Sequence, residues 1–168
     1  AENRMGSVLP VEIIINIEED GKFEDIQDVA VISFSDQLSK YISNIPEIGK
    51  VVSISDYLKE INKAMNEGNN AFYKVPLTRD IISQYMLLYD SEFSSLINAD
   101  YTKLRIAAQI KDIDSQRSAE IEEDINNHIS LIIPEGLTAE VTGTAFLALR
   151  TNNYLVYNLL ASFLVALI

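Results

Sequence analysis

The regular alternation of apolar and polar residues in two segments constrains the fold more than any other feature of this sequence. In residues 102–112, every second residue from Leu104 to Ile110 is apolar, and most of the residues between them are charged or carry an amide. Residues 11–18 alternate in the same way, with Ile14 as the exception. A period of two residues predicts β-strands. Because only one face of each strand is apolar, the pattern is typical of an antiparallel sheet whose other face meets solvent.

The segments around these strands complete two strand-helix-strand units. Apolar residues recur every three or four positions in residues 25–45 and again in residues 121–132, which predicts an amphipathic helix in each range. Short strands are predicted at 49–54 and 137–143. We therefore predict an α+β domain on the ferredoxin-like, split βαβ plan, in which helices cover one face of an antiparallel sheet.

Residues 54–90 interrupt this plan between the second and third strands. Ser53 and Asp56 match a capping box that opens a helix, and Gly68 marks the end of that helix. A further helix is predicted after Thr78. A ferredoxin-like domain does not need this helical insertion, and extra material on a rigid scaffold is a common place for binding.

Charge and composition exclude several classes of function. A net charge of −12 would repel nucleic acid, whose binding depends on basic residues. The chain has no cysteine, and we find neither a nucleophile elbow nor a phosphate-binding glycine loop. His128 is the only histidine and has no second ligand at helical spacing, while the acidic runs lack the pattern of a calcium loop. The sequence predicts a protein that is not an enzyme and holds no cofactor and no metal.

The end of the chain is strongly apolar. Residues 154–168 carry no charge, but they are fewer than the roughly 20 residues that a membrane helix needs. We interpret residues 1–150 as one domain, with a C-terminal helix that leads into a membrane span. Residues 151–168 would be the start of that span, cut off partway. The alternative is a buried C-terminal helix, although a core helix in so small a domain usually keeps a polar face.

Two patches of the sequence resemble the first extracytoplasmic loop of exporters of the RND superfamily, in the branch of MMPL-type lipid transporters and relatives of Patched. One patch is the V-T-G-T motif at residues 141–144, which resembles the end of the last strand of a porter domain. The other begins at the second strand and runs through the insertion. Its matching residues are Val52, Ser53, Ile54, Asp56, Tyr57, Leu58 and Lys59, then Pro76, and then Gln84, Tyr85, Leu87 and Leu88.

The resemblance implies a porter domain on the periplasmic or extracellular side of the cell membrane. It implies export of a hydrophobic or lipid-like substrate, driven by proton or sodium movement through carboxylates in membrane helices outside this chain. The implied partners are the membrane, through adjoining helices, and the second extracytoplasmic loop of the same transporter.

Two other interpretations stay open. The chain could be a cytoplasmic, ferredoxin-like ligand-binding or regulatory module whose apolar tail is a dimerisation helix. It could also be a small protein anchored in a membrane by its tail.

The side chains of the insertion suit a hydrophobic ligand with a polar head, because they combine broad aromatic faces, thioethers and polar tips. For any single residue, packing against the sheet explains its type equally well, so the hypothesis concerns the patch as a whole. We expect Phe72, Tyr73 and Met86 to be exposed. The candidate residues of the substrate path are Tyr57, Met65, Phe72, Tyr73, Tyr85, Met86 and Tyr89.

Overall fold

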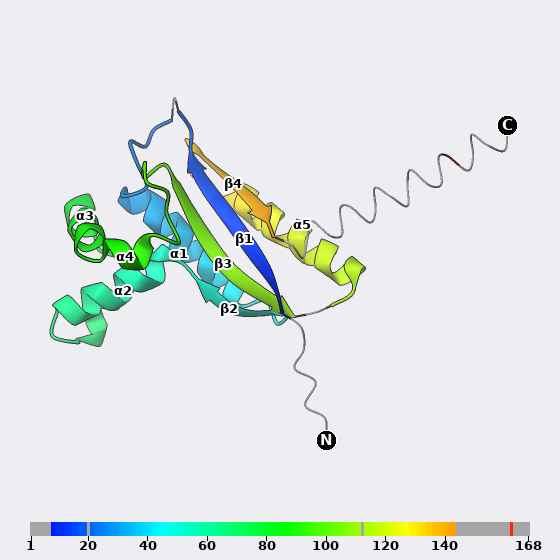
Figure 1. Ribbon diagram of the computed structural model, residues 1–168, viewed down its shortest axis with the longest axis horizontal. Coiled ribbons are helices and arrows are strands. Elements are labelled where there is room, and N and C mark those ends of the chain that lie inside the picture. The colour runs from blue at the N-terminus through cyan, green and yellow to red at the C-terminus, as the bar shows by residue number, and fades with distance from the viewer. Residues whose placement is uncertain (1–7, 20, 112, 144–161, 163–168) are drawn as a thin grey trace, which may run out of the picture.

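A computed structural model describes residues 8–19, 21–111, 113–143 and 162 of the chain (Figure 1). The elements follow one another in the predicted order, with two short helices that the sequence did not indicate. They are β1 (Val8–Ile17), α1 (Val29–Ser43), β2 (Ile48–Val52), α2 (Ile54–Met65), the 3-10 helix η1 (Asn70–Phe72), α3 (Arg79–Leu88), α4 (Asp90–Phe93), β3 (Lys103–Lys111), α5 (Ser115–Ile132) and β4 (Leu137–Thr142).

The strands form a four-stranded sheet in the order β2-β3-β1-β4, and every neighbouring pair is antiparallel. The connections through α1 and α5 therefore each join two parallel strands that have a third strand between them. This is the split βαβ arrangement, so the predicted α+β, ferredoxin-like fold is confirmed. In the register of the central pair, Ile13 lies opposite Ile106 and Ile15 lies opposite Leu104.

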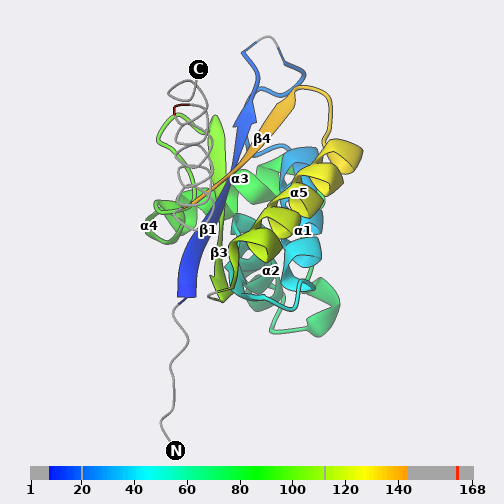
Figure 2. The same ribbon diagram turned by 90° about the vertical axis from the view of Figure 1, so that its right-hand side faces the viewer.

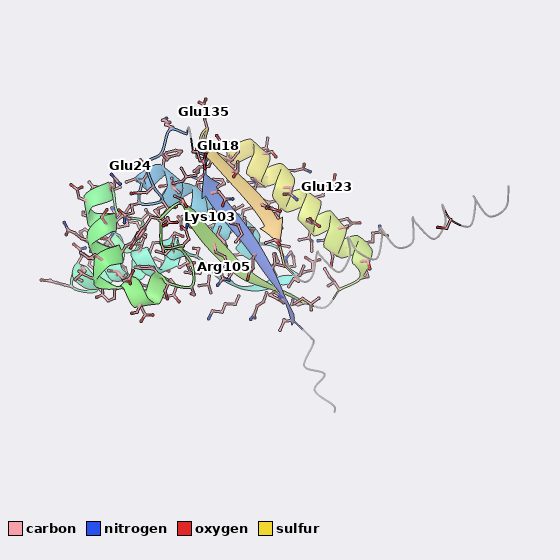
Figure 3. All side chains as sticks on the ribbon, turned by 45° about the horizontal axis from the view of Figure 1, so that its top comes forward. Glu18, Glu24, Lys103, Arg105, Glu123 and Glu135 are labelled. Atoms are coloured by element: carbon pink, nitrogen blue, oxygen red, sulfur yellow. The ribbon has the colours of Figure 1, made fainter. Side chains whose placement is uncertain are left out.

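The predicted one-sided burial of the strands is also confirmed. Along β3, buried residues alternate with exposed or half-buried ones, and along β1 residues 11, 13 and 15 are fully buried. Helices α1 and α5 lie together on one side of the sheet (Figure 2). Lys103 and Arg105 occupy the polar positions of β3 (Figure 3), and a nitrogen of the Arg105 guanidinium lies 3.1 Å from a carboxylate oxygen of Glu12.

The starts of the two covering helices differ from the predicted ranges because an aspartate caps each of them. The carboxylate of Asp28 accepts the backbone N–H of Ala30, so α1 begins at Val29 and not at Asp25. The carboxylate of Asp114 accepts the backbone N–H of Arg117, so α5 begins six residues before Ile121. Apolar periodicity locates the buried face of a helix but does not locate its first turn.

The insertion is longer than predicted. Helix α4 follows α3 directly, and its Phe93 is fully buried. Beyond α4, Leu96 is also buried, and Ile97 forms an isolated bridge with Leu104 of β3. The helical part of the insertion therefore extends a few residues beyond the predicted end near residue 90, and the apolar residues after it pack onto the sheet before β3 begins.

Gly143 brings the end of β4 against the start of β1. Its φ is +129°, and a Cβ atom on it would lie 2.5 Å from the carbonyl oxygen of Pro10 and 2.9 Å from Cα of Val11. Only glycine fits this close approach. The polypeptide therefore enters β1 and leaves β4 side by side, at one end of the sheet.

The insertion leaves the sheet partway along its edge and rejoins it at the opposite end. Val52, the last residue of β2, pairs with Ala107 of β3, which pairs with Glu12 of β1, so β2 ends level with the first half of β1. The chain returns to the sheet at Lys103, which pairs with Asn16 near the end of β1. Helix α2 starts two residues after β2 ends. Figure 1 shows α2, α3 and α4 grouped together, away from the first residues of β1.

The predicted membrane segment, residues 151–168, lies outside the described residues except for Ser162. Within the part of the chain that the structure describes, no helix is both long enough and apolar enough to cross a membrane.

Candidate functional site

An open groove of about 480 Å³ lies where the insertion leaves the sheet. One side is formed by β2, which is an edge strand, and the other by the first two turns of α2. We call it the β2–α2 groove. Its lining residues are Lys50, Val51 and Val52 from β2, Asp56, Tyr57 and Glu60 from α2, and Tyr73 from the segment after η1.

The predicted capping box shapes this groove. The carboxylate of Asp56 accepts the backbone N–H of Ser53 at 3.1 Å and its hydroxyl at 2.8 Å. These bonds turn the chain from strand to helix within a few residues. Val52 and Tyr57 therefore lie on two different walls of one groove although they are only five residues apart in the sequence.

Two tyrosine rings supply most of the aromatic surface of the groove. Tyr57 is 36% exposed and meets the buried ring of Phe93 edge-on, with 6.0 Å between the ring centroids. Tyr73 is 46% exposed, and the ammonium groups of Lys59 and Lys63 lie 5.6 Å and 5.9 Å from the centroid of its ring. An apolar ligand in the groove would contact the ring of Tyr57, which packs against the core, and the ring of Tyr73, which lies beside two ammonium groups.

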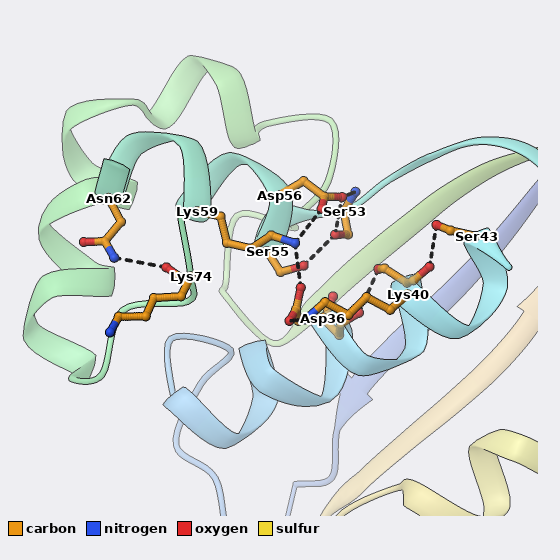
Figure 4. Close-up of polar contacts among 11 residues, drawn as sticks. Asp36, Lys40, Ser43, Ser53, Ser55, Asp56, Lys59, Asn62 and Lys74 are labelled. Atoms are coloured by element: carbon orange, nitrogen blue, oxygen red, sulfur yellow. Dashed lines mark hydrogen bonds and ion pairs between the residues drawn. The ribbon is translucent and has the colours of Figure 1, made fainter. Parts of the chain in front are cut away.

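A charge cluster, formed by Asp36, Lys40, Asp56 and Lys59, lies beside the groove, and Asp36 and Lys59 are its buried members (Figure 4). The ammonium group of Lys59 is 2.7 Å from a carboxylate oxygen of Asp36 on α1 and 2.9 Å from one of Asp56. Lys40 contacts the other oxygen of Asp36 at 2.6 Å. Only 8% of the Lys59 side chain and 11% of the Asp36 side chain are exposed. This cluster ties the insertion to the helix layer of the ferredoxin-like domain.

The surroundings of Asp36 and Lys59 stabilise the charged form of both side chains. Burial acts to raise the pKa of Asp36, but hydrogen bonds and charges from Lys40 and Lys59 outweigh it, and the pKa falls below its ordinary value of 3.8. Burial likewise acts to lower the pKa of Lys59, but bonds to Asp36 and Asp56 outweigh it, and the pKa rises above its ordinary value of 10.5. Both residues are therefore ionised at neutral pH.

These shifts predict how the stability depends on pH. The contribution of Asp36 to the free energy of unfolding is complete above pH 3.8 and is lost as the pH falls through the lowered pKa of the folded state. The contribution of Lys59 is complete below pH 10.5 and is lost as the pH rises through its raised pKa. We expect the difference in unfolding free energy between the wild type and Asp36→Asn to be constant from about pH 5 to 9 and to shrink below 3.8. Thermal unfolding across this range measures it. A difference that stays constant down to about pH 2 would contradict the assignment.

The structure brings together only some of the predicted candidates. Tyr57 and Tyr73 line the groove. Phe72 precedes Tyr73 and is 37% exposed, and Met65 ends α2 with 48% exposed. Tyr89 is 36% exposed at the far end of α3, and neither it nor Met65 lines the groove.

One prediction about α3 is wrong. Met86, which we expected to be exposed, is only 1% exposed, and with Ile82 it forms the buried face of the helix. Leu88 is 66% exposed. Tyr85 is half-buried, and its hydroxyl group lies 3.3 Å from the side-chain oxygen of Asn62 on α2. Helix α3 contacts α2 and α4, and its buried side carries Ile82 and Met86.

Sequence reasoning missed Lys59, Asp36 and Asn62. The signal was present on α2, where Ser55, Lys59 and Asn62 follow at helical spacing and form a polar stripe beside the apolar one. All three of these α2 residues are buried. A polar stripe of this kind is normally taken as a solvated face. Only the contacts of Lys59 with α1, and of Asn62 with Phe72, Lys74 and Tyr85, show that it is covered.

His128, to which we assigned no role, stacks on Tyr41, with 3.5 Å between ring centroids and 4° between the ring planes. The Tyr41 hydroxyl donates to Asp124 at 2.7 Å, which raises the pKa of Tyr41. The described residues contain no group of three or more histidine, cysteine, aspartate or glutamate side chains able to hold a metal ion.

The comparisons with known proteins assign no family to this chain. No protein-family model matches the sequence, and no curated protein is significantly similar to it. The family resemblance therefore depends on the two sequence patches alone.

Proposed function

We propose that the chain forms the first extracytoplasmic porter domain of an RND-type exporter, where it contacts a hydrophobic or amphiphilic substrate. The observation that carries this proposal is the proximity of the two ends of the domain at Gly143 and Pro10. A loop between two membrane helices must start and finish close together. The glycine of the V-T-G-T patch is the residue that permits this approach.

The distribution of exposed apolar side chains supports a role for the insertion in contacting a substrate. Among the described residues, eight of the ten exposed large hydrophobic side chains lie between Tyr57 and Tyr89. A concentration of exposed apolar surface marks a binding region. The insertion leaves the edge strand β2 partway along the sheet and rejoins the sheet at the end opposite the two connections, so a membrane-tethered domain would present it at its side and its far end. There it would meet the matching domain of the second loop.

The β2–α2 groove is the most specific contact site within the insertion. It combines Tyr57, Tyr73 and two valines with the charged groups of Lys50 and Glu60, for which the described residues offer no ion pair. Apolar walls with a few charged groups at the rim suit an amphiphile. The ion that drives transport would be handled by membrane helices outside this chain.

The location of the domain can be tested with a cysteine-labelling experiment. The segment has no cysteine, so Asn70→Cys, at an exposed position on η1, adds a single thiol to it. In the full-length protein without other accessible cysteines, we expect a membrane-impermeant maleimide to label this thiol in intact cells. Labelling that requires lysis of the cells would contradict the proposal and favour the cytoplasmic ligand-binding module.

The role of the groove can be tested in the same cells with an apolar dye, N-phenyl-1-naphthylamine, as the exported probe. We expect Tyr73→Ala to slow its export, because the ring forms one wall of the groove. Tyr89→Ala is the matched control, since Tyr89 is similarly exposed in the same insertion but lies outside the groove. Equal export by both variants at wild-type protein levels would remove the groove from the path.

A further inference from the structure

Residues 67–74 form a segment that contributes no buried residue to the core. We call this segment, which connects α2 to the chain before α3, the strap. All eight of its residues are exposed, and none of the residues of η1 within it is buried. Phe72 and Tyr73 are its only large apolar side chains, at 37% and 46% exposed, so its local stability depends on their partial burial and on a few hydrogen bonds.

The two ends of the strap differ in a way that suits a hinge. Glu67 and Gly68, at the end of α2, have φ values of +58° and +74°, and for glutamate this left-handed backbone is costly. At the other end, Val75 is half-buried and Pro76 is buried, which anchors the chain before α3. Movement at the first end would relieve the conformational strain of the left-handed backbone at Glu67, while the second end stays fixed.

A single buried amide fastens the strap to α2. The side-chain nitrogen of Asn62 donates to the carbonyl oxygens of Phe72 and Lys74, both at 3.0 Å, and its oxygen accepts the hydroxyl of Tyr85. Figure 4 shows Asn62 reaching from α2 toward Lys74. The residue is only 7% exposed. One side chain therefore joins α2, the strap and α3.

The position of the strap sets the shape of the groove, because Tyr73 belongs to both. We propose that the strap is a lid that opens and closes over the β2–α2 groove, with Asn62 as its latch and Tyr73 as its contact with the ligand. In the closed position, Tyr73 lies against Lys59 and Lys63 and narrows the groove. When the latch is released, the ring moves away and the valines of β2 become accessible. The inference rests on the proposed function only in taking this groove as the ligand site.

The latch can be tested by hydrogen exchange of the full 168-residue chain in detergent micelles. We expect Asn62→Ala to speed amide exchange in residues 69–75 by about tenfold or more, because the variant removes both bonds to the strap. Exchange in β3 should be unchanged, which also shows that the variant is folded. Asn126→Ala is the matched control, since Asn126 is a partly buried asparagine that bonds to a carbonyl on α5, far from the strap.

A second variant separates the latch from general damage to the fold. Asn62→Asp keeps an oxygen for Tyr85 but loses the donor to Phe72 and Lys74, so it should loosen the strap as Asn62→Ala does. Unchanged exchange in residues 69–75 in either folded variant would overturn the assignment of Asn62 as the latch.

Access to the groove is measured with Val52→Cys, which places the only thiol of the chain on the β2 wall. We expect N-ethylmaleimide to react with this thiol several times faster when Asn62→Ala is also present. If exchange in the strap rises but the reaction rate does not, the strap moves without covering the groove and the lid is refuted. Neither result depends on the cellular location of the domain, so failure of the proposed function would be seen separately.

Discussion

Replacing Lys59 with alanine is expected to lower the free energy of unfolding by about 3 kcal/mol, the low end of the range for breaking a buried ion pair. The substitution leaves the carboxylates of Asp36 and Asp56 without the ammonium group that lies between them. Lys40 still contacts Asp36, and Ser53 still donates to Asp56, which limits the loss. Thermal unfolding of the 168-residue chain, followed by circular dichroism, measures the effect.

Lys40→Ala provides the matched control, because Lys40 contacts the same carboxylate of Asp36 from the surface. Its side chain is 66% exposed, whereas that of Lys59 is 8% exposed. An exposed ion pair contributes between about 0 and 1 kcal/mol, so Lys40→Ala should change stability little. Equal losses of unfolding free energy in the two variants would mean that the burial of Lys59 does not determine how much its ion pairs stabilise the fold.

The double variant Asp36→Asn, Lys59→Met tests whether the stability lost in Lys59→Ala is caused by the charge that this substitution leaves unpaired. It removes the two most deeply buried charges of the cluster together and keeps a long side chain at position 59. Because replacement of a whole buried pair by neutral side chains is often close to neutral, we expect it to be more stable than Lys59→Ala alone. A double variant as unstable as Lys59→Ala would show that the attraction within the ion pair, and not an unpaired charge, explains the loss.

The sequence predicted the ferredoxin-like sheet because its signals are local. The alternation along residues 102–112 and 11–18 fixes which side chains face the core, and the observed burial follows it. The capping box at Ser53 and Asp56 is also a local signal, and it is present. Each of these features depends on residues that are close together in the chain.

The parts that could not be predicted depend on contacts between distant segments. The burial of Lys59 depends on Asp36, which is 23 residues earlier and on another helix. The role of Asn62 depends on two backbone carbonyls of the strap. No periodic pattern along one helix identifies the partner that covers it, so the polar stripe on α2 was not identified as buried.

The same limitation explains the error at Met86. Helix α3 has apolar residues around most of its circumference, including Ile81, Ile82, Met86, Leu87 and Leu88, so periodicity alone allows several orientations. In the folded domain α3 contacts α2 and α4, and the orientation that it adopts there buries Ile82 and Met86. Leu87 is left 79% exposed in that orientation. The exposed leucines of α3 are therefore a consequence of how the insertion packs on itself.

The two methionines of the insertion provide a test of this packing with one type of substitution. Met86 is 1% exposed on α3, and Met65 is 48% exposed at the end of α2. We expect Met86→Ala to lower the free energy of unfolding by about 2–5 kcal/mol, because it leaves a cavity between α3 and its neighbours. Met65→Ala should change it by no more than about 0.5 kcal/mol, since its side chain is largely in solvent.

Thermal unfolding of both variants, measured under the same conditions, decides between two descriptions of the insertion. A large loss for Met86→Ala alone means that the insertion has a packed core and unfolds together with the sheet, so that the groove has one rigid wall on α2 and one movable wall in the strap. Equal and small losses would mean that α3 is only loosely attached. In that case Tyr85 could not hold Asn62 in place, and the strap would lack a fixed point to close against.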